Sequence, residues 1–210
     1  MSIIFNFSLE FGFRNRIIGG GGCSTRSLRS PHSTDIHYMR QMPTELQEYE
    51  RLVRESIESG SCDLFRNASS MHAAVILRLF CEYAKKSVHI LCGRLSEMVY
   101  GELTPYLEGA VRRGVDVRVL TVQGAAELQS KAVAEYLRSV KRLRCLGTTD
   151  DKLRVPHFAL VDDKLFRIET DGEHRQAIVA TNIAENETEK QEAMRLRQDA
   201  FERLWSHVPA

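Results

Sequence analysis

The sequence predicts one α/β domain in which a single mixed β-sheet is flanked by helices. Helical and strand-like segments alternate through the first two thirds of the chain, and three short strands joined by turns follow. An amphipathic helix then closes the chain. Alternating helices and strands are typical of α/β folds, and a hairpin-like pair adds antiparallel strands to the sheet. The 210 residues suffice for one sizeable core, with or without a tail.

The first 42 residues differ in composition from the rest. They join an aromatic opening to a run of glycines at 19–22 and to a stretch rich in Ser and Arg. The opening lacks the basic start and the apolar run of a secretory signal, while the excess of Arg over acids leaves a transit peptide open. We expect residues 1–42 to be a disordered or non-native extension and residues 43–210 to form the domain.

Local signals set the boundaries of the expected elements. Thr44 to Gln47 form a capping-box pattern, Ser69 or Ser70 caps the next helix, and Gly114 ends a helix as its C′ glycine. The Thr104-Pro105 pair can divide one helical region into two. The expected order is helix 44–59, helix 69–86, strand 87–92, helix or helices 96–113, strand 115–120, helix 125–140, strand 143–146, strands 157–161, 165–169 and 176–181, and helix 184–205.

Composition narrows the function classes. The chain has 29 Lys and Arg against 28 Asp and Glu, so its net charge of +1 does not favour a dedicated nucleic-acid binder, although a local basic patch remains open. The five cysteines are odd in number and widely spaced, and three lie inside apolar patterns, which predicts reduced core thiols in a cytoplasmic protein. They include no CxxC pair, so we expect neither a zinc site nor another cofactor. No run approaches the roughly 20 apolar residues of a spanning helix.

Two stretches resemble the phospholipase D superfamily. Residues 110–120 match the family's A-x-x-R-G-V-x-V-R-V-L pattern, in which a helix leads into a core strand. Residues 155–164, followed by Asn182, resemble the family's motif of H-x-K, four residues and D, and the small-Ser/Thr-x-Asn sequence after it. With the closing residues 201–205, the resemblance covers roughly residues 68 to 206. It implies a phospholipase D-like sandwich.

The motif departs from the family where the chemistry occurs. If Asp162 takes the aspartate position, the motif histidine falls on Val155 and the motif lysine on His157. In the family the histidine attacks phosphorus, which valine cannot do, while the lysine and asparagine hold phosphate oxygens. The resemblance implies a degenerate motif in which His157 and Asn182 still hold an anion. The family also needs two motifs, so a homodimer would be required.

The candidate site residues each have a structural alternative. His157 is a candidate phosphate ligand or displaced nucleophile, and Asp162 is a candidate ligand or a turn residue. Thr181 and Asn182 are candidate anion ligands or the cap of the final helix. Arg94 is a candidate anion ligand or a solvated loop arginine. No metal ligand set is expected.

Three functions compete. The first is a non-catalytic domain, a pseudoenzyme, that binds phosphate or nucleic acid or contacts a protein partner. The second is a metal-independent phosphodiesterase or nuclease, in which His157 is the nucleophile within a homodimer. The third is an unrelated α/β interaction protein, which a separation of His157 from Asn182 would support. We expect no membrane-spanning segment.

Overall fold

The computed structural model describes residues 44–147, 156–171 and 176–209. The expected extension 1–42, Val155 and His174 lie outside these ranges. The first helices are α2 (Thr44–Ser59), α3 (Ser70–Tyr83), α4 (Glu97–Tyr100), α5 (Thr104–Arg112), the 3-10 turn η1 (Ala125–Glu127) and α6 (Lys131–Ser139). The strands are β1 (Leu64–Asn67), β2 (Ser87–Cys92), β3 (Asp116–Thr121), β4 (Leu143–Cys145), β5 (Phe158–Val161), β6 (Leu165–Asp171) and β7 (Gln176–Ala180). The last segment comprises η2 (Ile183–Glu185), α7 (Glu187–Arg195), the π-helical η3 (Leu196–Glu202) and α8 (Arg203–His207).

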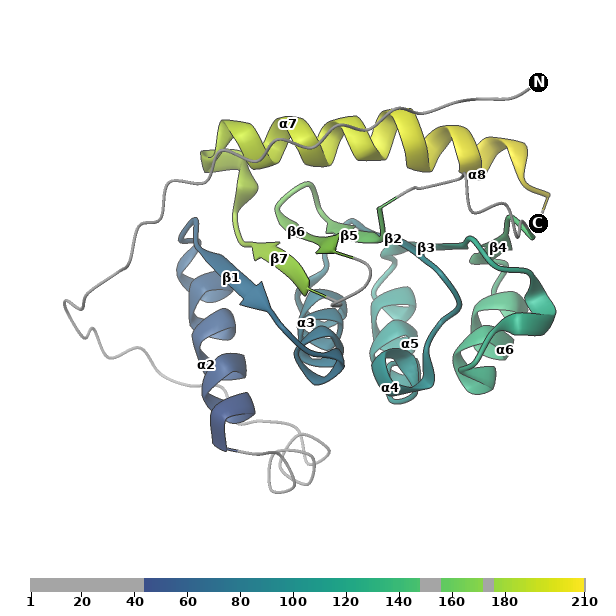
Figure 1. The fold of residues 1–210 in the computed structure, drawn as a ribbon, viewed down its shortest axis with the longest axis horizontal. Coiled ribbons are helices and arrows are strands. Elements are labelled where there is room, and N and C mark those ends of the chain that lie inside the picture. The colour runs from purple at the N-terminus through teal and green to yellow at the C-terminus, as the bar shows by residue number, and fades with distance from the viewer. Residues whose placement is uncertain (1–43, 148–155, 172–175, 210) are drawn as a thin grey trace.

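The strands form one seven-stranded mixed sheet in the order β1-β7-β6-β5-β2-β3-β4. Helices α2 to α6 cover one face, and the continuous helical segment from α7 to α8 crosses the other (Figure 1). This arrangement confirms the predicted α/β sandwich with one mixed sheet flanked by helices.

Strand directions define two edges of the sheet. Strands β2, β3 and β4 are parallel, whereas β5 is antiparallel to β2, and β6 and β7 each reverse again. We call the edge at the carboxyl ends of β2, β3 and β4 the carboxyl edge, and the opposite one the amino edge. β5 and β7 therefore start at the carboxyl edge and end at the amino edge.

Two apolar clusters fill the space on the two faces of the sheet. The α2–α6 face buries Val88, Ile90 and Val119 with residues of the helices, and the α7–α8 face buries Phe158, Leu160 and others around Phe201. Residues on one strand alternate between the faces because successive side chains point to opposite sides. His157, next to Phe158, therefore belongs to the α2–α6 side.

Several expected boundaries are confirmed. The Ser69 side chain accepts a hydrogen bond from the His72 N–H, α5 begins at Thr104 with a proline in its first turn, and Gly114 has a φ of 82°. The last helix differs, because α7 begins at Glu187 and Asn186, not Asn182, caps it. β1 was not predicted. Within the described ranges, no helix is long and apolar enough to cross a membrane.

Candidate functional site at the carboxyl edge

His157 lies at the carboxyl edge, immediately before β5, and pairs with Glu169 on β6. The Glu169 backbone N–H donates to the His157 carbonyl oxygen at 2.9 Å, so the two residues lie opposite each other. Their side chains also meet, with 2.8 Å between His157 Nδ1 and Glu169 Oε2. Because an ionised carboxylate only accepts, Nδ1 carries the proton and donates. The other ring nitrogen, Nε2, has no hydrogen bond to a described residue, and 38% of the side chain is exposed.

Glu169 is held in turn by buried polar groups. Arg167, two residues earlier on the same face of β6, donates to Glu169 Oε1 at 3.0 Å. The Asn67 amide is oriented so that both its nitrogen and its oxygen form hydrogen bonds. In this orientation the Asn67 side-chain oxygen accepts from Arg167 Nε at 3.0 Å and from the Ala73 N–H at 3.2 Å. Asn67 and Arg167 are both buried. The imidazole is thus oriented by a chain of side chains that starts at the beginning of α3.

These hydrogen-bonded side chains keep Glu169 ionised. Burial favours the neutral acid, but the hydrogen bond from His157 and the positive charge of Arg167 outweigh it and hold the pKa of Glu169 at about 2. A carboxylate in this state fixes the tautomer of the adjacent imidazole. Nε2 of the neutral ring then has a lone pair directed away from Glu169, and Nε2 of the protonated ring is a free donor.

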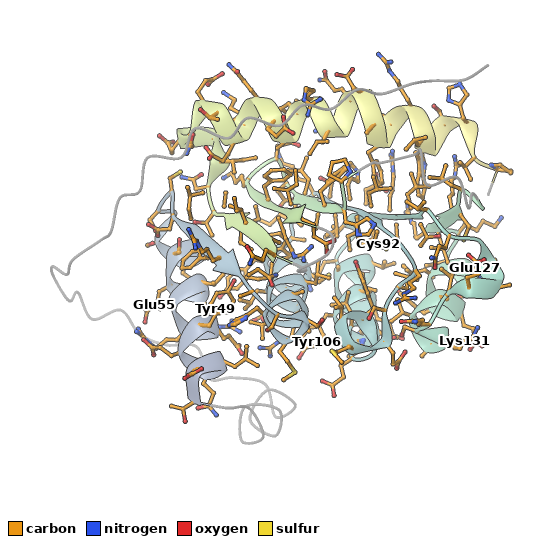
Figure 2. The ribbon with its side chains drawn as sticks, in the orientation of Figure 1. Tyr49, Glu55, Cys92, Tyr106, Glu127 and Lys131 are labelled. Atoms are coloured by element: carbon orange, nitrogen blue, oxygen red, sulfur yellow. The ribbon has the colours of Figure 1, made fainter. Side chains whose placement is uncertain are left out.

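The end of β2 forms the floor beneath the imidazole. A Cβ atom on Gly93 would lie 3.2 Å from His157 Cε1, so glycine permits the close approach of the ring. Arg94 follows Gly93 and is exposed, which places a cation at the same edge as His157. Cys92, labelled in Figure 2, is not a reactive thiol, because burial raises its pKa to about 11 although Tyr100 hydrogen-bonds to it.

Asp162 lies at the opposite, amino edge, where β5 ends. It has a φ of 55°, and its carboxylate accepts from the backbone N–H groups of Lys85, Lys86 and Ser87 at 2.7, 2.7 and 2.8 Å. The carboxylate therefore fastens the β5–β6 turn to the loop between α3 and β2. Asp162 is thus a turn residue, which is the structural alternative to its role as a ligand.

Thr181 and Asn182 also lie at the amino edge, after β7. Thr181 is fully buried, and its hydroxyl donates to the Ser61 carbonyl at 2.9 Å and contacts the Ser56 hydroxyl at 2.6 Å. Asn182 adopts a φ of 46°, and its side-chain nitrogen donates to the Gly60 carbonyl at 2.6 Å. Both side chains attach β7 to the end of α2.

The expectation that His157 and Asn182 share one anion pocket is therefore wrong, and their separation is the observation that would support an unrelated α/β interaction protein. Five residue steps along β5 separate His157 from Asp162, which corresponds to about 16 Å of strand. β7 carries Thr181 and Asn182 to that same far edge. Of the predicted site residues, the structure brings His157 and Arg94 to the carboxyl edge, and Asp162, Thr181 and Asn182 to the amino edge. Glu169, Arg167 and Asn67 were not predicted as site residues.

Three other titratable side chains have structural roles. His89 is buried and stacks on Phe201, with ring centroids 4.9 Å apart, while His72 packs against Tyr49 at 4.3 Å. Glu187 lies at the start of α7 and pairs with Lys190 at 3.5 Å. Within the described part of the chain, no group of three or more His, Cys, Asp or Glu side chains could hold a metal ion.

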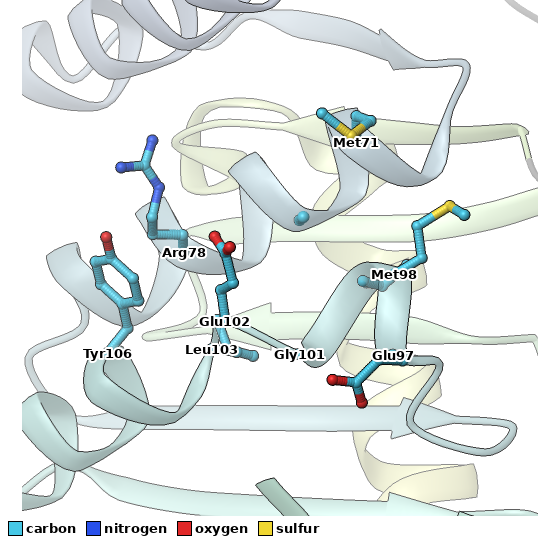
Figure 3. Close-up of a pocket in the computed structure, with 10 residues that line it drawn as sticks. Met71, Arg78, Glu97, Met98, Gly101, Glu102, Leu103 and Tyr106 are labelled. Carbon is cyan, nitrogen blue, oxygen red and sulfur yellow. The ribbon is translucent and has the colours of Figure 1, made fainter. Parts of the chain in front are cut away.

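A hollow of about 460 Å³ lies away from these residues, between α3, α4 and α5 (Figure 3). Met71 and Met98 line it and are exposed, with Glu97 and Glu102 nearby. Arg78 also lines it but is buried, ion-paired with Glu50 and 5.7 Å from the ring centroid of Tyr106. The hollow contains none of the carboxyl-edge groups described above.

Comparisons with solved structures support the fold. TrmBL2, described as an archaeal chromatin protein with a novel mode of DNA binding, matches with a TM-score of 0.51 and 14% identity over 83% of this chain. The match covers 63% of TrmBL2, so this chain spans less than two thirds of that protein's length. At this identity, the likeness concerns the fold alone.

Two further solved structures also match. Nuc from Salmonella typhimurium, a phospholipase D family member, has a TM-score of 0.49 and 15% identity over 71% of this chain and 96% of Nuc. NucT from Helicobacter pylori has a TM-score of 0.42 and 12% identity over 64% of this chain and 96% of NucT. The α/β fold with one mixed sheet is the fold class that the sequence predicts. No protein-family model matches the sequence, and no curated protein matches it.

Proposed function

We propose that this chain is a non-catalytic phospholipase D-like domain that binds a phosphodiester ligand, with nucleic acid favoured, at the carboxyl edge around His157. The supporting observation is the His157–Glu169 pair, which leaves one ring nitrogen without a hydrogen bond to any described residue, at the same edge as the exposed Arg94. A protonated imidazole held in this way donates Nδ1–H to Glu169 and Nε2–H to a phosphate oxygen. The fold is shared with a DNA-binding chromatin protein, which makes nucleic acid the first ligand to test.

The surroundings of the imidazole support binding without catalysis. A histidine that attacks phosphorus needs a second group to protonate the leaving oxygen. Among the described residues, the only titratable side chain bonded to His157 is Glu169, which is ionised and oriented toward Nδ1. Arg167 is buried and committed to Glu169 and Asn67. These groups suit a site that holds an anion without cleaving it.

Binding is tested by the fluorescence anisotropy of a labelled single-stranded oligonucleotide in EDTA. We expect His157→Gln to weaken binding about tenfold or more, because a hydrogen bond to a charged group contributes about 1.5–3 kcal/mol. Asn182→Gly is the matched control at the amino edge: it keeps the left-handed backbone and should change the affinity less than about twofold. Equal losses in both variants, or no binding by the wild type, would contradict the proposal.

A metal-independent phosphodiesterase is the second candidate. The same pair favours it, because neutral His157 has its Nε2 lone pair free for attack. A second copy of the chain would have to supply the missing acid, so this candidate requires a homodimer. Hydrolysis of a chromogenic diester in EDTA that disappears in His157→Gln, together with a dimer by size-exclusion chromatography, would establish the enzyme. Binding without hydrolysis supports the non-catalytic domain.

A further inference from the structure

A second hollow, of about 400 Å³, lies beside β4, the last strand in the order of the sheet. Its lining contains three cationic side chains, from Arg138 near the end of α6, Lys141 after that helix, and Arg144 on β4. Leu143 and Cys145 of β4 complete much of the wall. We call this the basic hollow. No carboxylate occurs among its described lining residues, although the net charge of the whole chain is only +1.

The cations of the basic hollow lack acidic partners within the described ranges. Arg138 donates to the Ala125 carbonyl at 3.2 Å, and the Arg144 guanidinium lies 4.5 Å from the centre of the Trp205 ring. By contrast, two arginines in the same part of the sheet are neutralised: Arg142 pairs with Asp116 at 2.7 Å, and Arg118 pairs with Asp116 at 2.8 Å and with Glu202 at 3.1 Å.

Helix ends account for part of this arrangement. Cations near the end of a helix interact favourably with its dipole, which explains Arg138 and Lys141 in part. Arg144, on β4, donates to the Trp205 carbonyl of α8 and lies over the Trp205 ring. Lys141 also has a φ of 57°, in the left-handed region that favours glycine or asparagine, so a lysine there brings charge at a backbone cost. An anionic ligand explains why three positive side chains line one hollow that has no carboxylate among its described lining residues.

We propose that the basic hollow binds the phosphate backbone of a nucleic-acid strand whose other contact is the carboxyl edge at His157. This inference rests on the proposed function and extends it from one phosphate to a polymer. Strands β2 and β3 lie between β4 and β5, so three strand spacings, about 14 Å, separate the two places. One phosphate group is too small to contact both, whereas successive phosphates of a strand span this distance.

The test compares oligothymidylates of about 12 nucleotides with inorganic pyrophosphate as ligands of the whole chain. The test variant is Arg138→Gln combined with Lys141→Asn, since asparagine tolerates the left-handed backbone. Lys164→Gln is the matched control, because Lys164 is exposed at the amino edge, in the β5–β6 turn. The variant should bind the oligonucleotide about tenfold more weakly near 0.1 M salt. The slope of log affinity against log salt should become shallower by about 1.4, which corresponds to two lost phosphate contacts.

The outcomes separate this inference from the proposed function. Weaker oligonucleotide binding in the double variant, with unchanged pyrophosphate binding and an unchanged melting temperature, supports it. Wild-type affinity and salt slope in the double variant, while His157→Gln weakens binding, would overturn the basic hollow and leave the proposed function intact. Weaker binding in the double variant, with wild-type binding in His157→Gln, would overturn the proposed function and, with it, a strand that contacts both places. Binding to phosphatidylserine vesicles but not to oligonucleotides would overturn both.

Discussion

Replacing Asp162 with alanine should destabilise the fold because its carboxylate accepts three backbone N–H groups. A hydrogen bond to a charged group contributes about 1.5–3 kcal/mol. Lys85 and Lys86 are exposed, so water can replace the carboxylate there, whereas Ser87 is half-buried. One full and two weakened bonds give about 3 kcal/mol, and alanine at positive φ adds about 1 kcal/mol. We therefore expect Asp162→Ala to lose about 4 kcal/mol of unfolding free energy.

Two variants separate these contributions. Asp163→Ala meets the same φ of 55° but loses only an ion pair with Arg197 whose acidic side is 46% exposed, so it should cost about 1–2 kcal/mol. Asp162→Asn keeps the oxygen that faces Lys86 and Ser87 and should cost about 1 kcal/mol. Urea unfolding measures all three variants as shifts in midpoint at a constant slope. If Asp162→Ala lies within about 1 kcal/mol of Asp163→Ala, the carboxylate does not fasten the turn.

Two further predictions concern the dependence of stability on pH. The pKa of Glu169 is held at about 2 in the folded state, below its unfolded value, so its stabilisation is present above about pH 5 and is lost as pH falls toward 2. Acid titration of unfolding should show about 2–3 kcal/mol less loss over this window in Glu169→Gln than in the wild type, and parallel curves would contradict the pairing with His157. Burial lowers the pKa of His89, so the unfolded state binds its proton first and stability falls as pH drops below about 6.5. His89→Phe, which preserves the stacking on Phe201, should flatten thermal stability between about pH 7 and 5, and an unchanged pH profile would show that His89 does not titrate on unfolding.

The sequence carried enough information to find part of the site. The two strands flanking Asp162, Asp163 and Lys164 were predicted, and an antiparallel pair closed by that turn places residue 157 opposite residue 169. His157 and Glu169 could therefore have been paired from the register alone. Asn67 could not, because β1 has four residues, of which Leu64 and Arg66 are exposed, and lacks a strong strand signal.

The Asn182 prediction failed for a reason of topology. The motif resemblance places an asparagine after the strand that follows the aspartate turn. Here β6 returns to the carboxyl edge, and one more strand, β7, runs back to the amino edge before Asn182 is reached. The spacing of residues along the sequence does not show how often the strands reverse direction. The motif therefore did not predict that Asn182 and His157 lie at opposite edges, although the fold class was predicted correctly.

The most direct test of the proposed site maps ligand binding onto the two edges of the sheet by NMR. The ¹⁵N resonances of the His157 ring and the amide resonances of Gly93 and Asn182 would be followed as a single-stranded oligonucleotide is added. Binding at the carboxyl edge predicts that His157 Nε2 and Gly93 shift with ligand while Asn182 does not. Shifts at Asn182 with an unchanged His157 ring would contradict the site.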